Sequence, residues 1–133
     1  ELYFLMHDEK EASVVVIVSH VVNILVAGFL GVVLFGNISS KMGVLGQRLE
    51  VIYGGETNAR KILSCMYLAI AILSVLSLSI NNFLLLVSVP LFGMQIIYKV
   101  LTLFSVGTIR HPVVFANLVI SVLHAVSIAV LLQ

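Results

Sequence analysis

Two apolar runs separated by one polar pair dominate the middle of the chain. Residues 62–80 read ILSCMYLAIAILSVLSLSI, residues 81–82 are NN, and residues 83–106 read FLLLVSVPLFGMQIIYKVLTLFSV. A helix needs about 20 apolar residues, each rising 1.5 Å, to cross the hydrocarbon core of a bilayer. Both runs meet that length, so the stretch predicts two transmembrane helices joined by a tight turn at Asn81-Asn82.

Two further runs of the same kind flank this pair. Ala12–Gly36 precedes it and Pro112–Leu132 follows it, with the proline in the first helical turn, where its missing N–H costs no hydrogen bond. The chain has 133 residues, of which 61% are hydrophobic and 10% charged, whereas a soluble domain carries about 25% charged residues. We therefore predict an all-α, multi-pass membrane protein, a single antiparallel bundle of four transmembrane helices formed by residues 6–133.

The first residues are treated separately. Residues 1–4, ELYF, resemble part of a protease-cleavage tag without its usual asparagine and glutamine, and Met6 is a natural start residue. Residues 1–5 are therefore either an expression remnant or native sequence, and no function is assigned to them. The first apolar run has no small-residue cleavage site, which favours a membrane span over a signal peptide.

The long connection between the first two spans, residues 37–61, has a pattern of its own. Met42, Leu45, Leu49 and Ile52 recur at spacings of three and four. This spacing is typical of a short amphipathic helix that lies at the membrane surface. We predict such an interfacial helix between spans 1 and 2.

Basic residues are distributed unequally between the two ends of the predicted bundle. Four spans place the long connection and the turn at 107–111 on one side, and the other side carries Lys10 as its only lysine or arginine. The positive-inside rule then predicts that the more basic side is cytoplasmic and that both termini are extracytoplasmic. The basic residues of the cytoplasmic side are Lys41, Arg48, Arg60, Lys61 and Arg110.

Strongly polar side chains within the spans need a reason, because they are costly in hydrocarbon. His20 and His124 each lie eight residues from the outer end of their helix, at a depth of about 12 Å. Asn23 is one turn deeper than His20, and Asn117, Ser121 and His124 share one helical stripe. If the two stripes face each other, these five residues form a polar pocket in the outer half of the bundle.

Several interpretations of the histidine pair remain open. Two imidazoles on facing helices can hold a b-type haem or begin a copper site, and histidine can also handle protons near neutral pH. Two ligands are too few for a closed zinc site, and no carboxylate lies in any span. The structural alternative is that His20 and His124 hydrogen-bond to each other, to the asparagines or to the backbone. We expect no cofactor, and if this pocket does hold one, it would be haem or copper.

A second polar group lies toward the cytoplasmic end of the third span. Gln95, Lys99 and Thr102 fall on one stripe, and with Arg110 they predict a site for an anion or a lipid headgroup. The alternative is that Lys99 extends its long stem to the headgroup region.

Small residues and one proline suggest how the spans pack. Ala27 and Gly31 form a small-xxx-small pair, which lets helices approach closely, either within the bundle or against another protein. Pro90 lies in the middle of the third span and should bend that helix, either for packing or as a gate.

The motif content argues against catalysis and against nucleic acid as a partner. The chain lacks HExxH, GxSxG and P-loop motifs, and Asp8 is its only aspartate. The net charge of +1 is too small for phosphate binding by clustered cations. In size and span number the chain is similar to small four-helix multidrug transporters. Those transporters rely on a carboxylate within the first span, whereas Glu11 lies at or outside its edge here.

Two function classes follow from these observations. The first is a non-catalytic subunit or assembly partner of a larger membrane complex, in contact with lipids and with other membrane subunits or copies of itself. The alternative is a small membrane binding or transport protein that uses the His20–His124 pocket for haem, a metal, protons or a small ligand.

Overall fold

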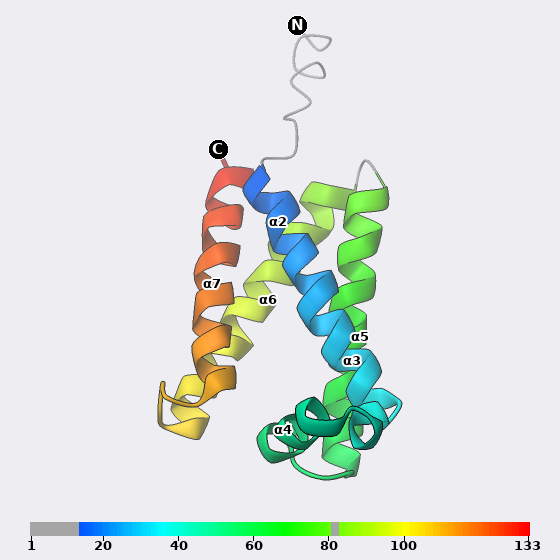
Figure 1. Cartoon of the computed structure of the whole chain (residues 1–133). Coiled ribbons are helices and arrows are strands. Elements are labelled where there is room, and N and C mark those ends of the chain that lie inside the picture. Colours follow the sequence, from blue (N-terminus) through cyan, green and yellow to red (C-terminus); the bar gives the residue numbers. More distant parts are fainter. Residues whose placement is uncertain (1–13, 81–82) are drawn as a thin grey trace, which may run out of the picture.

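A computed structural model of the chain describes residues 14–80 and 83–133 (Figure 1). These residues form helices and connecting turns, without a strand among them. The tag-like residues 1–5 and the predicted turn at Asn81-Asn82 lie outside the described residues.

The described residues contain four helices that are long and apolar enough to cross a membrane, as the hydropathy of the chain predicted. They support an integral, multi-pass membrane protein. The first span, Val14–Phe35, consists of α2 (Val14–Val22), a π-helical turn η1 (Asn23–Ala27) and α3 (Gly28–Phe35). The remaining elements are a 3-10 turn η2 (Ile38–Lys41), the short helix α4 (Gly43–Tyr53), and the spans α5 (Asn58–Ser79), α6 (Phe83–Val106) and α7 (Pro112–Leu131).

The spans cross the molecule in alternating directions in Figure 1. The start of α2 lies beside the end of α7, whereas α4 and the turn at 107–111 lie at the opposite end. The first half of the first span, α2, packs against α7, but the second half, α3, packs against α5. Figure 1 shows that α3 and α7 consequently diverge toward the end where α4 lies.

The helix ends follow from local sequence. The hydroxyl of Thr57 accepts a hydrogen bond of 3.2 Å from the backbone N–H of Arg60 and so caps α5. Gly54 and Gly107, with φ angles of +76° and +73°, follow directly after α4 and α6, because glycine adopts this backbone conformation without strain. Pro90 lies inside α6, which continues on both sides of it.

The interior of the bundle is rich in polar side chains, whereas most of its exposed side chains are large and apolar. Water-soluble proteins show the opposite distribution. In a membrane, apolar side chains face lipid at no cost, and polar groups join the helices through hydrogen bonds. The buried polar side chains of the four spans are Ser19, His20, Asn23, Arg60, Ser64, Ser74, Ser77, Ser88, Gln95, Lys99, Asn117, Ser121, His124 and Ser127.

The small residues of the first span face α5. A Cβ atom at Gly31 would lie 2.8 Å from Cγ of Leu68 and 3.0 Å from its backbone nitrogen. Ala27 is buried beside them, and a Cβ at Gly28 would lie 3.5 Å from Cβ of Ala71. Of the two interpretations of the small-xxx-small pair, packing within the bundle is therefore the one observed.

Arg60 holds α4 against the start of α5. Its side chain is only 4% exposed, and it donates hydrogen bonds of 2.7 Å to the carbonyl of Gly54 and to the hydroxyl of Ser39. The hydroxyl of Ser39 donates in turn to Glu50, at 3.2 Å. Arg60 is one of the five cations on which the predicted orientation rests, and its side chain is buried, whereas the other four are exposed.

The inward face of α4 differs from the predicted one. Leu49 is buried, but Leu45 is 48% exposed. The face turned inward instead begins at Gly46, where a Cβ atom would collide with the backbone carbonyl of Ser39. The apolar spacing located a helix correctly, but the close contact of Gly46 with the 3-10 turn determines which way the helix faces.

Candidate functional site

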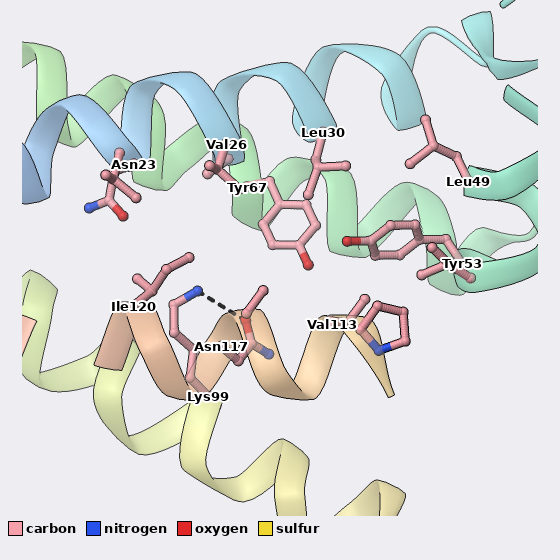
Figure 2. Close-up of a pocket in the computed structure, with 15 residues that line it drawn as sticks. Asn23, Val26, Leu30, Leu49, Tyr53, Tyr67, Lys99, Val113, Asn117 and Ile120 are labelled. Atoms are coloured by element: carbon pink, nitrogen blue, oxygen red, sulfur yellow. Dashed lines mark hydrogen bonds between the residues drawn. The ribbon is translucent and has the colours of Figure 1, made fainter. Parts of the chain in front are cut away.

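A cavity of about 180 Å³ lies where α3 and α7 diverge, and α4 covers one end of it (Figure 2). Most of its wall is hydrocarbon, and its polar groups come from Asn23, Tyr53, Tyr67, Lys99 and Asn117. The apolar lining residues are Val22, Val26, Ala27, Leu30, Leu49, Ile52, Pro112, Val113, Ala116 and Ile120.

The ammonium group of Lys99 is the positive charge of this cavity. The Lys99 side chain is only 5% exposed, and its Nζ donates a hydrogen bond of 3.3 Å to Oδ1 of Asn117. Nζ also lies 4.9 Å from the ring centroid of Tyr98, within the range of a cation–π contact. A charge-assisted hydrogen bond is normally about 2.7–2.9 Å long. Lys99 is therefore weakly satisfied for a buried ammonium group with three N–H donors.

No described carboxylate side chain neutralises Lys99. The described chain contains two, Glu50 and Glu56. Glu50 accepts from Ser39, and Glu56 forms an ion pair of 2.9 Å with Lys61. The hydrogen bond and the attraction of Lys61 hold the pKa of Glu56 below its usual value, so this carboxylate is charged at neutral pH. Both carboxylates are thus engaged away from the cavity.

Two asparagines border the site from different helices. Asn117 donates through Nδ2 to the hydroxyl of Thr102, at 3.2 Å, which turns its Oδ1 toward Lys99. Asn23 donates to the hydroxyl of Ser74, at 3.1 Å, and so ties the first span to α5. Asn23 is the first residue of the π-helical turn. Such turns are rare and are frequent at functional sites.

Tyr53 and Tyr67 close the end of the cavity next to α4. Their ring centroids are 6.5 Å apart in an edge-to-face arrangement, and Figure 2 shows the two hydroxyl groups pointing toward each other. Burial raises the pKa of Tyr53 above its ordinary value, and the neighbouring Tyr67 adds to this effect. The hydroxyl of Tyr53 therefore keeps its proton at neutral pH.

The two histidines lie outside this cavity and contact the same phenylalanine. The ring centroids of His20 and His124 are 4.7 Å and 4.5 Å from that of Phe92. Nε2 of His20 is hydrogen-bonded to the hydroxyl of Ser88, at 2.7 Å, and Nε2 of His124 to Oε1 of Gln95, at 3.3 Å. Both imidazoles are fully buried, and both hydrogen bonds join α6 to a neighbouring helix.

The five residues predicted to form one pocket therefore do not lie in one site. Asn23 and Asn117 line the cavity, whereas His20 and His124 pack against Phe92. The hydroxyl of Ser121 donates to the carbonyl of Asn117 in its own helix, at 2.8 Å. The Phe92 ring, which polar spacing alone does not reveal, lies against both imidazoles.

A metal at the histidines would have to displace existing contacts. Both Nε2 atoms are already hydrogen-bonded, and Phe92 packs against both rings. Across the described residues, no group of three histidine, cysteine or acidic side chains could hold a metal. The remaining nitrogens, Nδ1 of His20 and of His124, are buried without a hydrogen-bond partner in this part of the chain.

The predicted anion site of Gln95, Lys99 and Arg110 is also divided. Gln95 is hydrogen-bonded to His124, outside the cavity. Lys99 lines the cavity, and Arg110 is exposed on the turn after α6. The Lys99 side chain is buried on the inward stripe of α6 with Phe92 and Gln95.

Sequence reasoning missed the contribution of the two tyrosines. Tyr67 lies on the buried stripe of α5 with Ser64 and Ala71, at spacings of three and four, so the periodicity of that span could have revealed it. Tyr53 reaches the cavity only because α4 folds back over it, which no local pattern indicates.

Comparisons with models of known protein families, with curated proteins and with solved structures give no match.

Proposed function

We propose that this protein is a small membrane binding protein whose ligand carries a negative charge, bound by Lys99 in the cavity between α3, α4 and α7. The observation that carries the proposal is the burial of the Lys99 ammonium beside a cavity, without a carboxylate partner among the described residues.

The cost of a buried charge supports this function. A lysine at the centre of a membrane helix costs about 2.5–3.5 kcal/mol on insertion scales, and such residues normally pair with an opposite charge. Asn117 supplies only one hydrogen bond of 3.3 Å. A ligand anion would supply the missing charge, and the protonated hydroxyl of Tyr53 would offer a further donor.

The same proposal includes an arrangement in the membrane. The four spans form an antiparallel bundle, α4 lies at the membrane surface, its end of the bundle is cytoplasmic, and both termini are extracytoplasmic. The course of the chain in Figure 1 supports the antiparallel order. The exposed cations near α4 support its orientation by the positive-inside rule. Those cations are Lys41, Arg48, Lys61 and Arg110.

The role of subunit or assembly partner, predicted from the sequence, remains compatible with this function. The outward faces of the spans are apolar and could contact lipid or other membrane chains equally well. The pair Ala27 and Gly31, which could have marked a docking face, packs inside the chain. No described feature favours a protein partner over lipid, so we advance the binding role.

The test is an analysis of small molecules that remain with the protein after extraction from its own membrane in mild detergent. We expect the wild-type chain to retain an anionic molecule in near-stoichiometric amount. Lys99→Met should lose it, whereas the control Lys61→Met, which changes an exposed lysine of α5, should keep it. Equal amounts of every anionic molecule in wild type and Lys99→Met would overturn the proposal.

A further inference from the structure

The rim of the cavity lies on the outward-facing sides of the π-helical turn η1 and of α7. Val26 of η1 is 44% exposed and Ala116 of α7 is also exposed, although both line the cavity. Beyond η1 the first span continues as α3, which diverges from α7 in Figure 1. In a bilayer these positions face hydrocarbon, so the cavity opens sideways toward lipid tails.

The end of the cavity that faces the membrane surface is covered by α4. Leu49, Ile52 and Tyr53 of this helix form that part of the wall. Arg60 fastens α4 to α5 through Gly54 and Ser39. A ligand that arrived from water would have to pass between this helix and Pro112 of α7, whereas a ligand that arrived from the bilayer would meet the exposed rim at Val26 and Ala116.

The volume limits how much of a ligand can enter. Sites that enclose a drug-sized molecule measure about 300–1,000 Å³, whereas this cavity measures about 180 Å³. It can hold a small headgroup and the first carbons of one chain, but not a bulky headgroup or two chains. The remainder of the ligand would leave at the exposed rim between Val26 and Ala116, which line the cavity from the first span and from α7.

The charge and the donors of the site fit a carboxylate better than a phosphate. Lys99 is the only lysine or arginine that lines the cavity in the described part of the chain. A phosphate monoester carries nearly two negative charges at neutral pH, more than one ammonium group neutralises. One ammonium, with the Tyr53 hydroxyl beside the same cavity, matches a single negative charge.

We infer that the ligand is a single-chain amphiphile with one carboxylate, that is, a long-chain fatty acid, which enters from the bilayer between α3 and α7. This inference rests on the proposed function, because it requires that Lys99 bind an anion. It adds the chemical class of the ligand and the route by which the ligand arrives.

The experiment measures binding of radiolabelled palmitate to the full chain in phosphatidylcholine nanodiscs, with nanodiscs lacking protein as the blank. The probes for comparison are acetate, inorganic phosphate, hexadecanol and hexadecyl phosphate. We expect saturable binding of about one palmitate per chain, with weaker binding of the other four. Lys99→Met should weaken palmitate binding by roughly tenfold or more, a loss of about 1.4 kcal/mol, and Lys61→Met should leave it unchanged.

A second variant tests the route. Ala116→Trp places a large ring at the exposed rim, so it should abolish palmitate binding. Because this variant could fail to fold, a photoreactive fatty acid with its reactive group near the chain end is used on the wild-type protein. It should label Val26 or Ala116 and not α4.

The outcomes separate this inference from the proposed function. Lys99-dependent binding of acetate or phosphate, without stronger binding of palmitate, would overturn the fatty acid and leave anion binding intact. Tighter binding of hexadecyl phosphate than of palmitate would overturn the carboxylate, and labelling of α4 would overturn the sideways route. If no anion binds in a Lys99-dependent manner, both proposals fail.

Discussion

Nζ of Lys99 lies 3.3 Å from Oδ1 of Asn117, and this is the one hydrogen bond found for that ammonium in the described chain. The contact joins α6 to α7 at the side of the cavity. An amide oxygen carries only a partial charge, so the contact orients the ammonium without neutralising it. The site is consequently costly for the ligand-free protein and favourable for an anion.

Removing the charge of Lys99 should therefore have opposite effects on ligand binding and on the stability of the ligand-free protein. We expect Lys99→Met to make the ligand-free protein more stable by about 1 kcal/mol or more, because replacing a buried charge by a well-packed apolar side chain is often stabilising. Reversible unfolding in mixed micelles, with the ligand removed, measures this change. A clear loss of stability instead would assign Lys99 a structural role through Asn117.

The histidines should be dispensable for ligand binding. His20→Phe and His124→Phe change residues that contact Phe92 but do not line the cavity, so both variants should retain the bound anion. Each should lose about 0.6 kcal/mol of stability, and at most about 1.7 kcal/mol, because one hydrogen bond between helices is removed. Ligand analysis of the purified variants checks the first point, and loss of the anion would restore the histidine pocket predicted from the sequence.

Two glycines provide a matched pair of packing tests. Gly31→Ala should destabilise the protein by about 1–3 kcal/mol, because the new methyl would meet Leu68 at 2.8 Å. Gly93→Ala, in α6, meets no atom within 4 Å and should be neutral or slightly stabilising. Unfolding in mixed micelles compares the two, and equal stabilities would contradict the close packing of α3 on α5.

Arg60 should control the attachment of α4. Arg60→Met removes the hydrogen bonds to Gly54 and Ser39, so the amides of residues 43–53 should exchange faster with deuterium. Losing two hydrogen bonds to a charged group should lower the free energy needed to detach α4 by about 1.5–3 kcal/mol or more. The control Arg48→Met, at an exposed position of the same helix, should leave the exchange of the segment unchanged. Unaltered exchange in Arg60→Met would show that apolar contacts alone hold α4.

The sequence predicted the helical class and the membrane spans well, because both depend on long apolar runs that need no knowledge of neighbours. Bilayer thickness fixes the length of a spanning helix, and runs such as residues 83–106 match the observed α6. The apolar runs also fix how far along their helices Lys99 and His124 lie, so these positions could be predicted too. Periodicity also gave the stripe that Asn117 and Ser121 share.

The grouping of these side chains could not be predicted, because it depends on which stripes face one another. His20 and Asn23 lie on the same inward side, yet one packs against Phe92 and the other lines the cavity. The divergence of α3 from α7 produces this difference, and it follows from the close contact of Gly31 with Leu68. The composition of the site therefore depends on a contact between two segments that are distant in sequence, and the sequence of either segment alone does not reveal this contact.

The contact between Lys99 and Asn117 also sets an order for the biogenesis of the protein. During synthesis α6 emerges from the ribosome before α7, so Lys99 reaches the translocon before its amide partner exists. Inserting that helix alone would place the Lys99 ammonium in hydrocarbon without Asn117, at a cost of at most about 2.5–3.5 kcal/mol, the value for a helix centre. The α6 segment should therefore wait at the edge of the translocon until α7 arrives, and the two should enter the lipid as one hairpin.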